Sequence, residues 1–397
     1  IKHRFEALVS ACLSFVPLIY FLYGGNLSEE WSLPFIYAGL YIYLQYFTGK
    51  RREIRALDVA AEGVLCGLVL MIRVNGACVF AVFSVVLLIW LLLKKDISGA
   101  VKCIVSFFAG VLASFLPFAI WYASKGALKE MWEVYISFNM YYSELHGGFS
   151  PGNVISLSVY FITRDPMLWL PFVTLLPVIL LEKKDYWRFI FYLFMGVSCL
   201  CAAMGGQPHV HYAMYLIPCL TVPIACTLSA LLHFASKKGG NIGAIALRCV
   251  IIFVCVAYLR WDPPVGEQRH VFSRLKTIAS EDQRMLDHIA QNTEPGDDIL
   301  VTGLNARIYY ASGHLCGSRR FIQHFMYDYD GALMKEMLDY VDTDSPRLII
   351  LPLRNVDGDP WGEWMTAFDS ELRKRMSEGH FVRYSDDVFV AYRSVED

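Results

Sequence analysis

Long apolar runs, broken by short polar stretches, occupy the first 260 residues of the chain. A helix needs about 20 mostly apolar residues to cross the hydrocarbon core of a bilayer, so each run predicts a membrane span. The nine predicted spans are residues 5–23, 33–47, 57–72, 77–93, 99–123, 166–181, 186–204, 212–234 and 243–259. Two of them are short and are expected to be tilted or re-entrant.

The connection between the fifth and sixth predicted spans, residues 124–165, is long and rich in aromatic residues. Residues 130–142 place aromatic side chains at helical spacing, which predicts an amphipathic helix lying in the membrane interface. Tyr141, Tyr142 and Glu144 would either line a sugar or lipid site or belong to the aromatic belt typical of an interface.

The pattern changes after residue 260, where short apolar stretches alternate with amphipathic ones. Helices are predicted at 268–292, 306–311, 331–341 and 362–378, and strands at 298–302, 347–353, 381–384 and 388–392. This alternation indicates a small α/β sandwich with a mainly parallel sheet. The predicted fold is therefore a polytopic α-helical membrane domain, residues 1–260, followed by a small α/β domain, residues 261–397.

The composition agrees with this division. The chain is 56% hydrophobic and 18% charged, whereas soluble domains carry about 25% charged residues. Most acidic residues follow residue 260, in the part expected to be globular. Ten of the eleven cysteines lie in the apolar runs, so Cys316 is alone in the tail and no disulfide is expected there. Zinc-type spacing does not occur, and no metal or cofactor is expected.

Basic residues in the short connections predict the orientation of the spans. If the nine spans alternate, these residues fall on one side, which the positive-inside rule assigns to the cytoplasm. They are Lys2, Arg4, Lys50, Arg51, Arg52, Arg55, Lys94, Lys95, Lys183, Lys184, Arg188, Lys237 and Lys238. The connections 24–32, 73–76, 124–165 and 205–211 then face outward. We expect an integral protein of the cell inner membrane with an extracytoplasmic C-terminal domain.

Arg73 interrupts an apolar stretch at its predicted outer end and is followed by Val74, Asn75 and Gly76. Its guanidinium offers a bidentate fork that fits a phosphate, and the Asn-Gly break predicts a shaped loop beside it. Arg73 and Asn75 are therefore candidate substrate-binding residues. The alternative is an arginine that anchors a helix end by reaching into the interface.

Two histidines, His209 and His211, precede Tyr212 in a polar break between two apolar runs. A spacing of two residues in a loop presents both rings to one ligand, so all three residues are candidates for substrate binding. A metal pair is a weaker interpretation because no carboxylate lies nearby in the sequence. Alternatively, these are interfacial polar residues at the start of a helix.

Carboxylates on the predicted outer face are candidate general bases. Glu29 and Glu30 follow Ser28 in the first outer connection, where they would activate an acceptor hydroxyl. Alternatively, Ser28 caps a helix and the two acids favour its N-terminus. Arg164 ends the long outer connection and is a candidate second phosphate ligand, although a pair with Asp165 at a helix start explains it as well.

Four stretches resemble the polytopic type-C glycosyltransferases of family 39, the protein mannosyltransferases and their bacterial relatives, the lipid A aminoarabinose transferases. The stretches are residues 25–30 with Glu29 and Glu30; residues 67–76, ending in Ile72-Arg73-Val74-Asn75; residues 207–218 with Pro208, His211, Tyr212 and Pro218; and Glu294-Pro295-Gly296-Asp297 at the start of the tail. Together they extend the resemblance over most of the chain.

The resemblance implies transfer of a sugar from a polyprenyl-phosphate donor to a lipid, glycan or protein acceptor on the outer face of the membrane. Arg73, His211 and Tyr212 match the family pattern, with His209 adjacent, and basic residues would stabilise the departing lipid phosphate. Besides the donor and the acceptor, membrane lipids are expected partners, and nucleic acid is not.

The resemblance also implies a catalytic carboxylate in the family's first outer loop. The first predicted span here matches a later one, so that carboxylate is expected ahead of Ile1, in a chain whose beginning is missing. Glu29 and Glu30 stand in for it in the sequence given.

Two other functions stay open. A transporter or assembly protein for lipid-linked saccharides predicts internal repeats and ionisable residues deep inside the spans, whereas the ionisable residues are expected near the span ends. A membrane-anchored binding protein predicts a pocket in the C-terminal domain, formed by residues such as Arg319, Arg320, His324 and Asp328.

Overall fold

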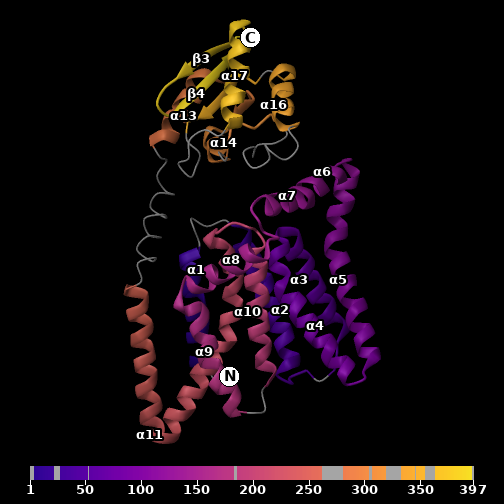
Figure 1. Ribbon diagram of the computed structural model, residues 1–397, viewed down its shortest axis with the longest axis vertical. Helices are drawn as coiled ribbons and strands as arrows, with labels where there is room; N and C mark the ends of the chain where they lie inside the picture. The colour runs from indigo at the N-terminus through magenta and orange to yellow at the C-terminus, as the bar shows by residue number, and fades with distance from the viewer. Residues whose placement is uncertain are drawn as a thin grey trace. The chain divides into compact units, whose positions relative to one another are not determined.

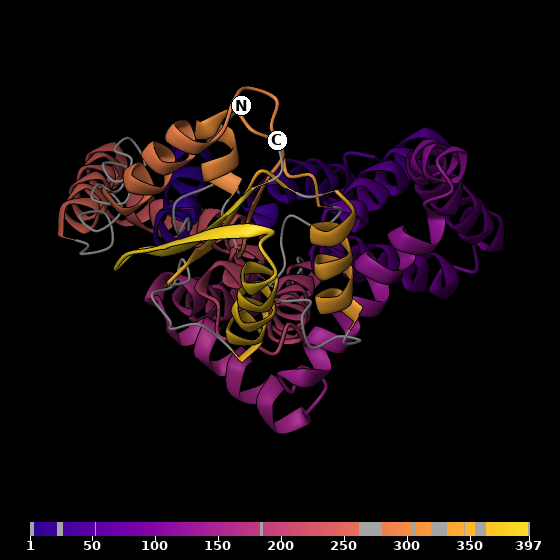
Figure 2. The same ribbon diagram turned by 90° about the horizontal axis from the view of Figure 1, so that it is seen from above.

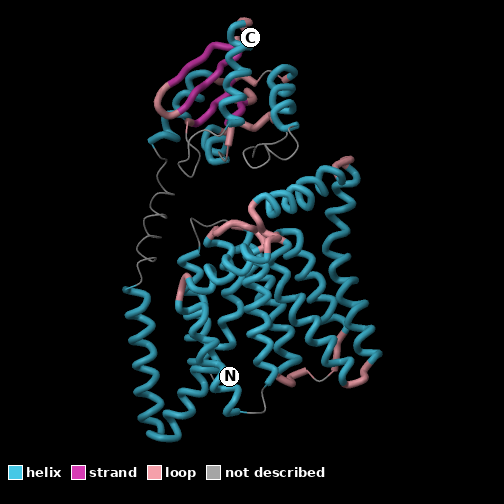
Figure 3. The backbone as a smooth tube through the Cα atoms, in the orientation of Figure 1, coloured by secondary structure: helices cyan, strands magenta, loops and turns pink. Residues whose placement is uncertain are grey.

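A computed structural model describes most of the chain. The described residues are 4–21, 27–51, 53–182, 186–261, 280–303, 306–318, 332–344, 346–353 and 363–395. They belong to two compact units, Ile1–Phe272 and Ser273–Asp397. Figure 3 shows the strands gathered in the second unit and helices in both. Arg319, Arg320, His324 and Asp328, and the predicted helix before residue 280, lie outside the described residues.

The first unit is helical (Figure 1). Its elements are α1 (Arg4–Phe21), α2 (Ser28–Phe47), α3 (Ala56–Ile72), η1 (Val74–Ala77), α4 (Cys78–Leu93), α5 (Ile97–Ser124), α6 (Leu128–Trp132), η2 (Glu133–Ser137), α7 (Phe138–Leu145), α8 (Pro151–Thr163), α9 (Pro166–Glu182), η3 (Tyr186–Phe189), α10 (Ile190–Ala203), η4 (Val210–Leu216) and α11 (Ile217–Trp261). Each predicted span overlaps one of these helices. The last two spans overlap the two arms of α11.

Helix α11 bends at Gly240, whose φ of 57° and ψ of −150° are not helical. Glycine adopts a positive φ without a Cβ clash, so it can turn the chain here. The bend follows Lys237 and Lys238, the polar pair that separates the last two predicted spans. A polar, glycine-containing break thus divides an apolar stretch into two arms.

Three helices among the described residues are long and apolar enough to cross a membrane: Val74–Leu93, Ile97–Ser124 and Val210–Ala257. Pro151–Thr163 and Pro166–Leu181, which are bent by 87°, would add a fourth if they form one broken span. Large apolar side chains on α5 are exposed, among them Phe108 at 64%. Exposed apolar surface of this kind is typical of helices that face lipid, and these features together indicate a membrane protein. The count of nine spans and their direction stay predictions.

Helices α3 and α5 pack closely because small residues line their contact. A Cβ added to Gly63 would collide with the carbonyl oxygen of Phe107, and one added to Gly110 with the carbonyl oxygen of Ala60. A Cβ added to Gly67 would collide with the side-chain hydroxyl of Ser114. Within each helix the small residues are four positions apart, the spacing that lets membrane helices approach backbone to backbone. We call Gly63, Gly67, Gly110 and Ser114 the small-residue seam.

The substitution Gly63→Ala is expected to destabilise the helical unit by about 1–3 kcal/mol, because a backbone carbonyl cannot move aside for the added methyl group. The measurement is the thermal unfolding midpoint of the purified protein in lipid nanodiscs. Gly196→Ala in α10 is the matched control, since a Cβ there meets no atom within 4 Å. Equal midpoints for the two variants would contradict close packing at the seam.

The second unit contains α13 (Ser280–Asn292), β1 (Ile299–Val301), α14 (Ala306–Ser312), α16 (Ala332–Thr343), β2 (Leu348–Pro352), α17 (Glu363–Ser377), β3 (Phe381–Ser385) and β4 (Phe389–Ser394). The sheet order is β1-β2-β4-β3. Only β1 and β2 are parallel, while β4 is antiparallel to both β2 and β3. The prediction of a mainly parallel sheet is therefore wrong, because the closing hairpin inserts β4 beside β2.

Helices cover both faces of this sheet. On one face, residues of β1, β2 and β4 form a buried cluster with α13 and α14. On the other face, the Tyr392 hydroxyl donates a hydrogen bond of 2.6 Å to Asp369 of α17. Figures 1 and 2 show α13 and α17 on opposite sides of the strands. Strand β2 is buried at every position, as expected of a strand covered on both sides.

Asp386 holds the β3–β4 turn against α13, and Asp386→Ala is expected to destabilise the hairpin by about 1–3 kcal/mol. Its Oδ1 accepts the backbone N–H groups of Val388 and Phe389 at 2.8 and 2.9 Å, and its Oδ2 pairs with Arg284 at 2.6 Å. Hydrogen exchange of the hairpin amides in the whole protein measures the loss. Asp387 also pairs with Arg284 but is 83% exposed, so Asp387→Ala is expected to change exchange little. A larger effect of Asp387→Ala would contradict this assignment.

Candidate functional site

The end of α3 and the beginning of α2 meet at one end of the helical unit. Arg73 directly follows α3, and Glu29 lies in the first turn of α2. The Nη1 atom of Arg73 lies 2.6 Å from Oε1 of Glu29 and donates a hydrogen bond of 3.3 Å to the Ser28 hydroxyl. That hydroxyl donates in turn to Oε2 of Glu29 at 3.0 Å. Residues 44 positions apart in the sequence thus form one polar cluster.

Burial differs sharply between the two charged partners. The Glu29 side chain is 1% exposed, whereas the Arg73 side chain is 28% exposed. The contact is an ion pair without hydrogen-bond alignment, since Oε1 of Glu29 accepts no hydrogen bond from the described residues. A buried charge pair is expensive to desolvate and strongly destabilising when one partner is removed. The pair therefore holds a carboxylate inside the protein and leaves part of a guanidinium open to an anion.

An aromatic cluster of Tyr212, His211 and His209 lies beside Arg73. The guanidinium carbon of Arg73 lies 4.3 Å from the centroid of the Tyr212 ring, a cation–π contact. The His211 ring lies 4.7 Å from Tyr212, and the rings of His209 and His211 are 5.4 Å apart and nearly parallel. Tyr212 is buried, His211 is half-buried and His209 is exposed. The His209 ring also lies 5.4 Å from Tyr212, so three of the predicted binding residues form one aromatic cluster beside Arg73.

Gly206 lies in the connection 205–211, just before the histidines, and allows it to pack against the end of α7. Its φ is 75°, and an added Cβ would lie 2.9 Å from the Cβ and carbonyl oxygen of His146. Asn153 donates to the carbonyl oxygens of His146 and Gly206 at 3.0 and 3.4 Å, and the Ser143 hydroxyl donates to that of Met204. The predicted connections 124–165 and 205–211 are therefore held together by hydrogen bonds and close packing.

Two tyrosines of the helix α6–η2–α7 also belong to this neighbourhood. Tyr135 and Tyr142 both interact electrostatically with Arg73. Tyr135 lies in the π-helical turn η2, a kind of turn that is frequent at functional sites. Its hydroxyl is buried and has no hydrogen-bond partner among the described residues. Burial raises the pKa of Tyr135, and it raises the pKa of Tyr142 to about 12, so both phenols stay neutral hydrogen-bond donors at neutral pH.

The helix that carries these tyrosines was predicted as an aromatic interfacial segment at residues 130–142, and the structure has continuous helical turns over 128–145. Tyr142 was named as a candidate for a sugar site. Tyr135 was not, since no sequence signal marks a π-helical turn. The electrostatic interaction of these two tyrosines with Arg73 depends on tertiary packing alone.

The other three predicted residues make different contacts. Asn75 donates to the carbonyl oxygen of Cys201 at 2.7 Å, which ties the turn after α3 to α10. Glu30 accepts the backbone N–H of Leu27 at 3.4 Å, so it satisfies a group at the start of α2. The Arg164 guanidinium stacks over Tyr160 of α8, 4.9 Å from its centroid. None of these contacts joins the residue to the Glu29–Arg73 pair.

The cluster combines groups for acid–base chemistry and for anion binding. Glu29 supplies a carboxylate, Arg73 a cation, and Tyr135 and Tyr142 neutral donors. No group of three or more His, Cys, Asp or Glu within the described residues is placed to hold a metal ion. The arrangement fits a substrate with an anionic group and hydroxyl groups.

Comparisons of the chain with models of protein families, with curated proteins and with solved structures found no match.

Proposed function

We propose that this membrane protein transfers a sugar from a polyprenyl-phosphate donor to a hydroxyl acceptor of the cell envelope. The observation that carries the proposal is the buried ion pair between Glu29 and Arg73, 2.6 Å apart at one end of the helical unit. Such a transfer needs a base that takes the acceptor's proton and a cation that stabilises the leaving phosphate, and this pair would supply both. The resemblance of the surrounding stretches to type-C glycosyltransferases supports the same reaction.

In the proposed step the acceptor oxygen attacks the anomeric carbon of the donor sugar. The acceptor proton passes to Oε1 of Glu29, and a new glycosidic bond forms. The bond between the anomeric carbon and the phosphate oxygen breaks, and its electron pair leaves with the lipid phosphate. Attack from the face opposite the phosphate inverts the anomeric centre. Each proton and electron pair is then accounted for without a nucleotide or a metal.

Arg73 stabilises the leaving phosphate in this scheme. A preorganised cation in a partly dry site stabilises developing negative charge much more than water does. When the donor binds, its phosphate competes with Glu29 for the guanidinium, and this competition releases the carboxylate to act as a base. Ser28 keeps one oxygen of Glu29 oriented through its hydrogen bond, and Tyr212 fixes the plane of the guanidinium.

The proposed sugar site lies between the aromatic cluster and the tyrosines of α6–η2–α7. Aromatic faces bind the apolar face of a sugar ring, and the neutral phenols of Tyr135 and Tyr142 donate to its hydroxyl groups. His209 is the exposed member of the cluster, and an acceptor would approach from its side. The sidedness predicted from the basic residues places this end on the outer face of the inner membrane, with the C-terminal unit on the same side.

The test uses the purified chain in liposomes with polyprenyl phosphates that carry different single sugars. Envelope lipids and glycans are supplied as acceptors, and release of polyprenyl phosphate is measured by chromatography. The expected result is release from one donor that depends on added acceptor. Absence of release from every donor, together with no saturable binding of polyprenyl phosphate itself, would overturn the proposal.

A further inference from the structure

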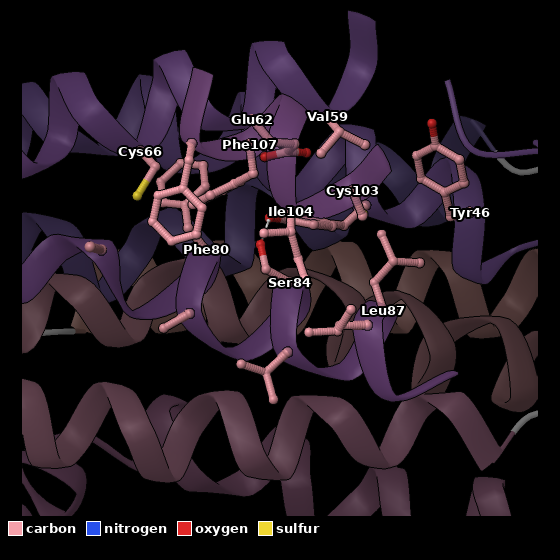
Figure 4. Close-up of a pocket in the computed structure, with 16 residues that line it drawn as sticks. Tyr46, Val59, Glu62, Cys66, Phe80, Ser84, Leu87, Cys103, Ile104 and Phe107 are labelled. Atoms are coloured by element: carbon pink, nitrogen blue, oxygen red, sulfur yellow. Dashed lines mark hydrogen bonds between the residues drawn. The ribbon is translucent and has the colours of Figure 1, made fainter. Parts of the chain in front are cut away.

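A cavity of about 330 Å³ lies among α2, α3, α4 and α5. Apolar side chains dominate its lining, including the rings of Phe80, Phe107 and Phe108 (Figure 4). Glu62 of α3 also lines it. Glu62 precedes Arg73 by 11 residues, which is about 16 Å along the helix axis. Glu62 is therefore well separated from Arg73, although the cavity lining extends to Ala77 of η1.

Glu62 is buried and unpartnered in this cavity. The residue is 2% exposed, and neither carboxylate oxygen has a hydrogen-bond partner among the described residues. A Cβ added to Gly39 of α2 would lie 2.9 Å from Oε2 of Glu62, so the carboxylate lies against the backbone of α2. Figure 4 shows it among the apolar side chains of the cavity wall.

The described residues that line the cavity supply no positive charge to this carboxylate. The other titratable groups that line the cavity are Tyr43 and Tyr46 of α2, Cys66 of α3 and Cys103 of α5, and no Lys, Arg or His is among the described lining residues. A carboxyl group in apolar surroundings is stable only when it carries a proton or is paired with a cation. A cation at this position must therefore come from a ligand.

Exposed residues that line the cavity indicate that such a ligand arrives from the bilayer. Val85 of α4 and Phe108 of α5 line the cavity and are 53% and 64% exposed. Exposed apolar residues on helices of a membrane unit face the hydrocarbon of the bilayer. A ligand that arrives from there needs an apolar body, and the carboxylate requires that it also carry one positive charge. Aromatic rings such as Phe80 favour a cation over their faces.

We propose that the Glu62 cavity is a binding site for a lipophilic amine. The ammonium group pairs with the Glu62 carboxylate, and the apolar body fills the space among the phenylalanine rings. When the bound amine enters as the neutral base and Glu62 carries a proton, that proton passes from Oε of Glu62 to the amine nitrogen, so charges and protons balance. The site is independent of the sugar-transfer proposal.

The test compares adamantylamine with adamantanol, which have the same apolar cage and differ in the charged group. Binding to the whole protein in lipid nanodiscs is measured by equilibrium dialysis with labelled ligand, after subtraction of partitioning into empty nanodiscs. Saturable binding of the amine is expected, with affinity at least about tenfold lower for Glu62→Gln, the size of effect that a charged hydrogen bond produces. Glu53→Gln is the matched control, because Glu53 is exposed in the connection before α3.

The outcomes separate the possibilities. Equal amine affinity for Glu62→Gln and the parent protein, or no saturable amine binding above empty nanodiscs, would overturn the proposal. Adamantanol binding as tightly as the amine would also overturn it, because the cavity would then be a purely apolar site. If Glu62→Gln does not fold, Ala81→Phe provides the second variant, since Ala81 lines the cavity and the added ring is expected to exclude the amine.

Discussion

The substitution Glu29→Gln is expected to lower the turnover number for sugar transfer by about 10²–10⁴-fold, the contribution of a general base. Glutamine keeps the shape of the side chain but cannot accept the acceptor's proton. The KM for the donor is expected not to rise, because Arg73 still binds the phosphate and the competing Glu29 carboxylate is gone. The measurement is steady-state release of polyprenyl phosphate by the protein in liposomes.

Glu30→Gln is the matched control for this experiment. Glu30 is the next residue in α2 and accepts the backbone N–H of Leu27, so its loss is expected to change turnover only a few-fold. Equal losses for the two variants would contradict the assignment of the base to Glu29. A Glu29→Gln variant with full activity would place the base on another carboxylate.

The substitution Arg73→Lys is expected to lower turnover by about 10²–10³-fold and to raise the KM for the donor as well. Lysine keeps the positive charge but loses the planar fork that binds a phosphate with two parallel hydrogen bonds, and it loses the stacking on Tyr212. Direct binding of polyprenyl phosphate, measured without a sugar, is expected to weaken in parallel. Arg164→Lys serves as the control, since Arg164 stacks on Tyr160 of α8.

Arg73→Ala is a less suitable variant because it leaves Glu29 buried without its cation, which destabilises a protein by about 3–5 kcal/mol. The double variant Arg73→Ala/Glu29→Gln removes both charges and is expected to recover the unfolding midpoint but not the activity. Recovery of activity in the double variant would show that the pair has only a structural role.

The helices of the first unit could be predicted closely from the sequence. Apolar runs of membrane length set where helices form, because backbone groups in an apolar environment must be paired within the helix. The break at Gly240 was marked in advance by Lys237 and Lys238. The strands of the second unit were also located within a few residues, but their order was not, because nothing in a strand's own sequence says which neighbour it pairs with.

The candidate site could be predicted only as separate residues. Arg73, Tyr212 and His211 were identified from polar positions that interrupt apolar runs, and the structure brings them together with Glu29. The pairing itself depends on how α2 lies against α3, which is set by side-chain packing along both helices. Asn75 and Glu30 were identified by the same reasoning, yet local backbone contacts explain their positions.

Glu62 shows where the sequence reasoning was wrong. Ionisable residues were expected near the ends of the spans, but Glu62 is buried within α3, inside the predicted span 57–72. This span also contains Asp58, and two acids among sixteen mostly apolar residues lower the mean hydropathy too little to mark Glu62. Its importance is visible only once the absence of a partner among the described residues is known.

The small-residue seam also affects how the results of a mutational scan of this protein should be interpreted. Substitution of Gly63, Gly67, Gly110 or Ser114 by any larger residue separates α3 from α5, and α3 carries Arg73 at its end. Such variants would score as inactive alongside those at Glu29 and Arg73, although no seam residue takes part in the proposed reaction. Two sets of positions would therefore be intolerant to substitution. Seam positions would be sensitive to the volume of the new side chain, whereas positions of the proposed reacting centre would be sensitive to its charge.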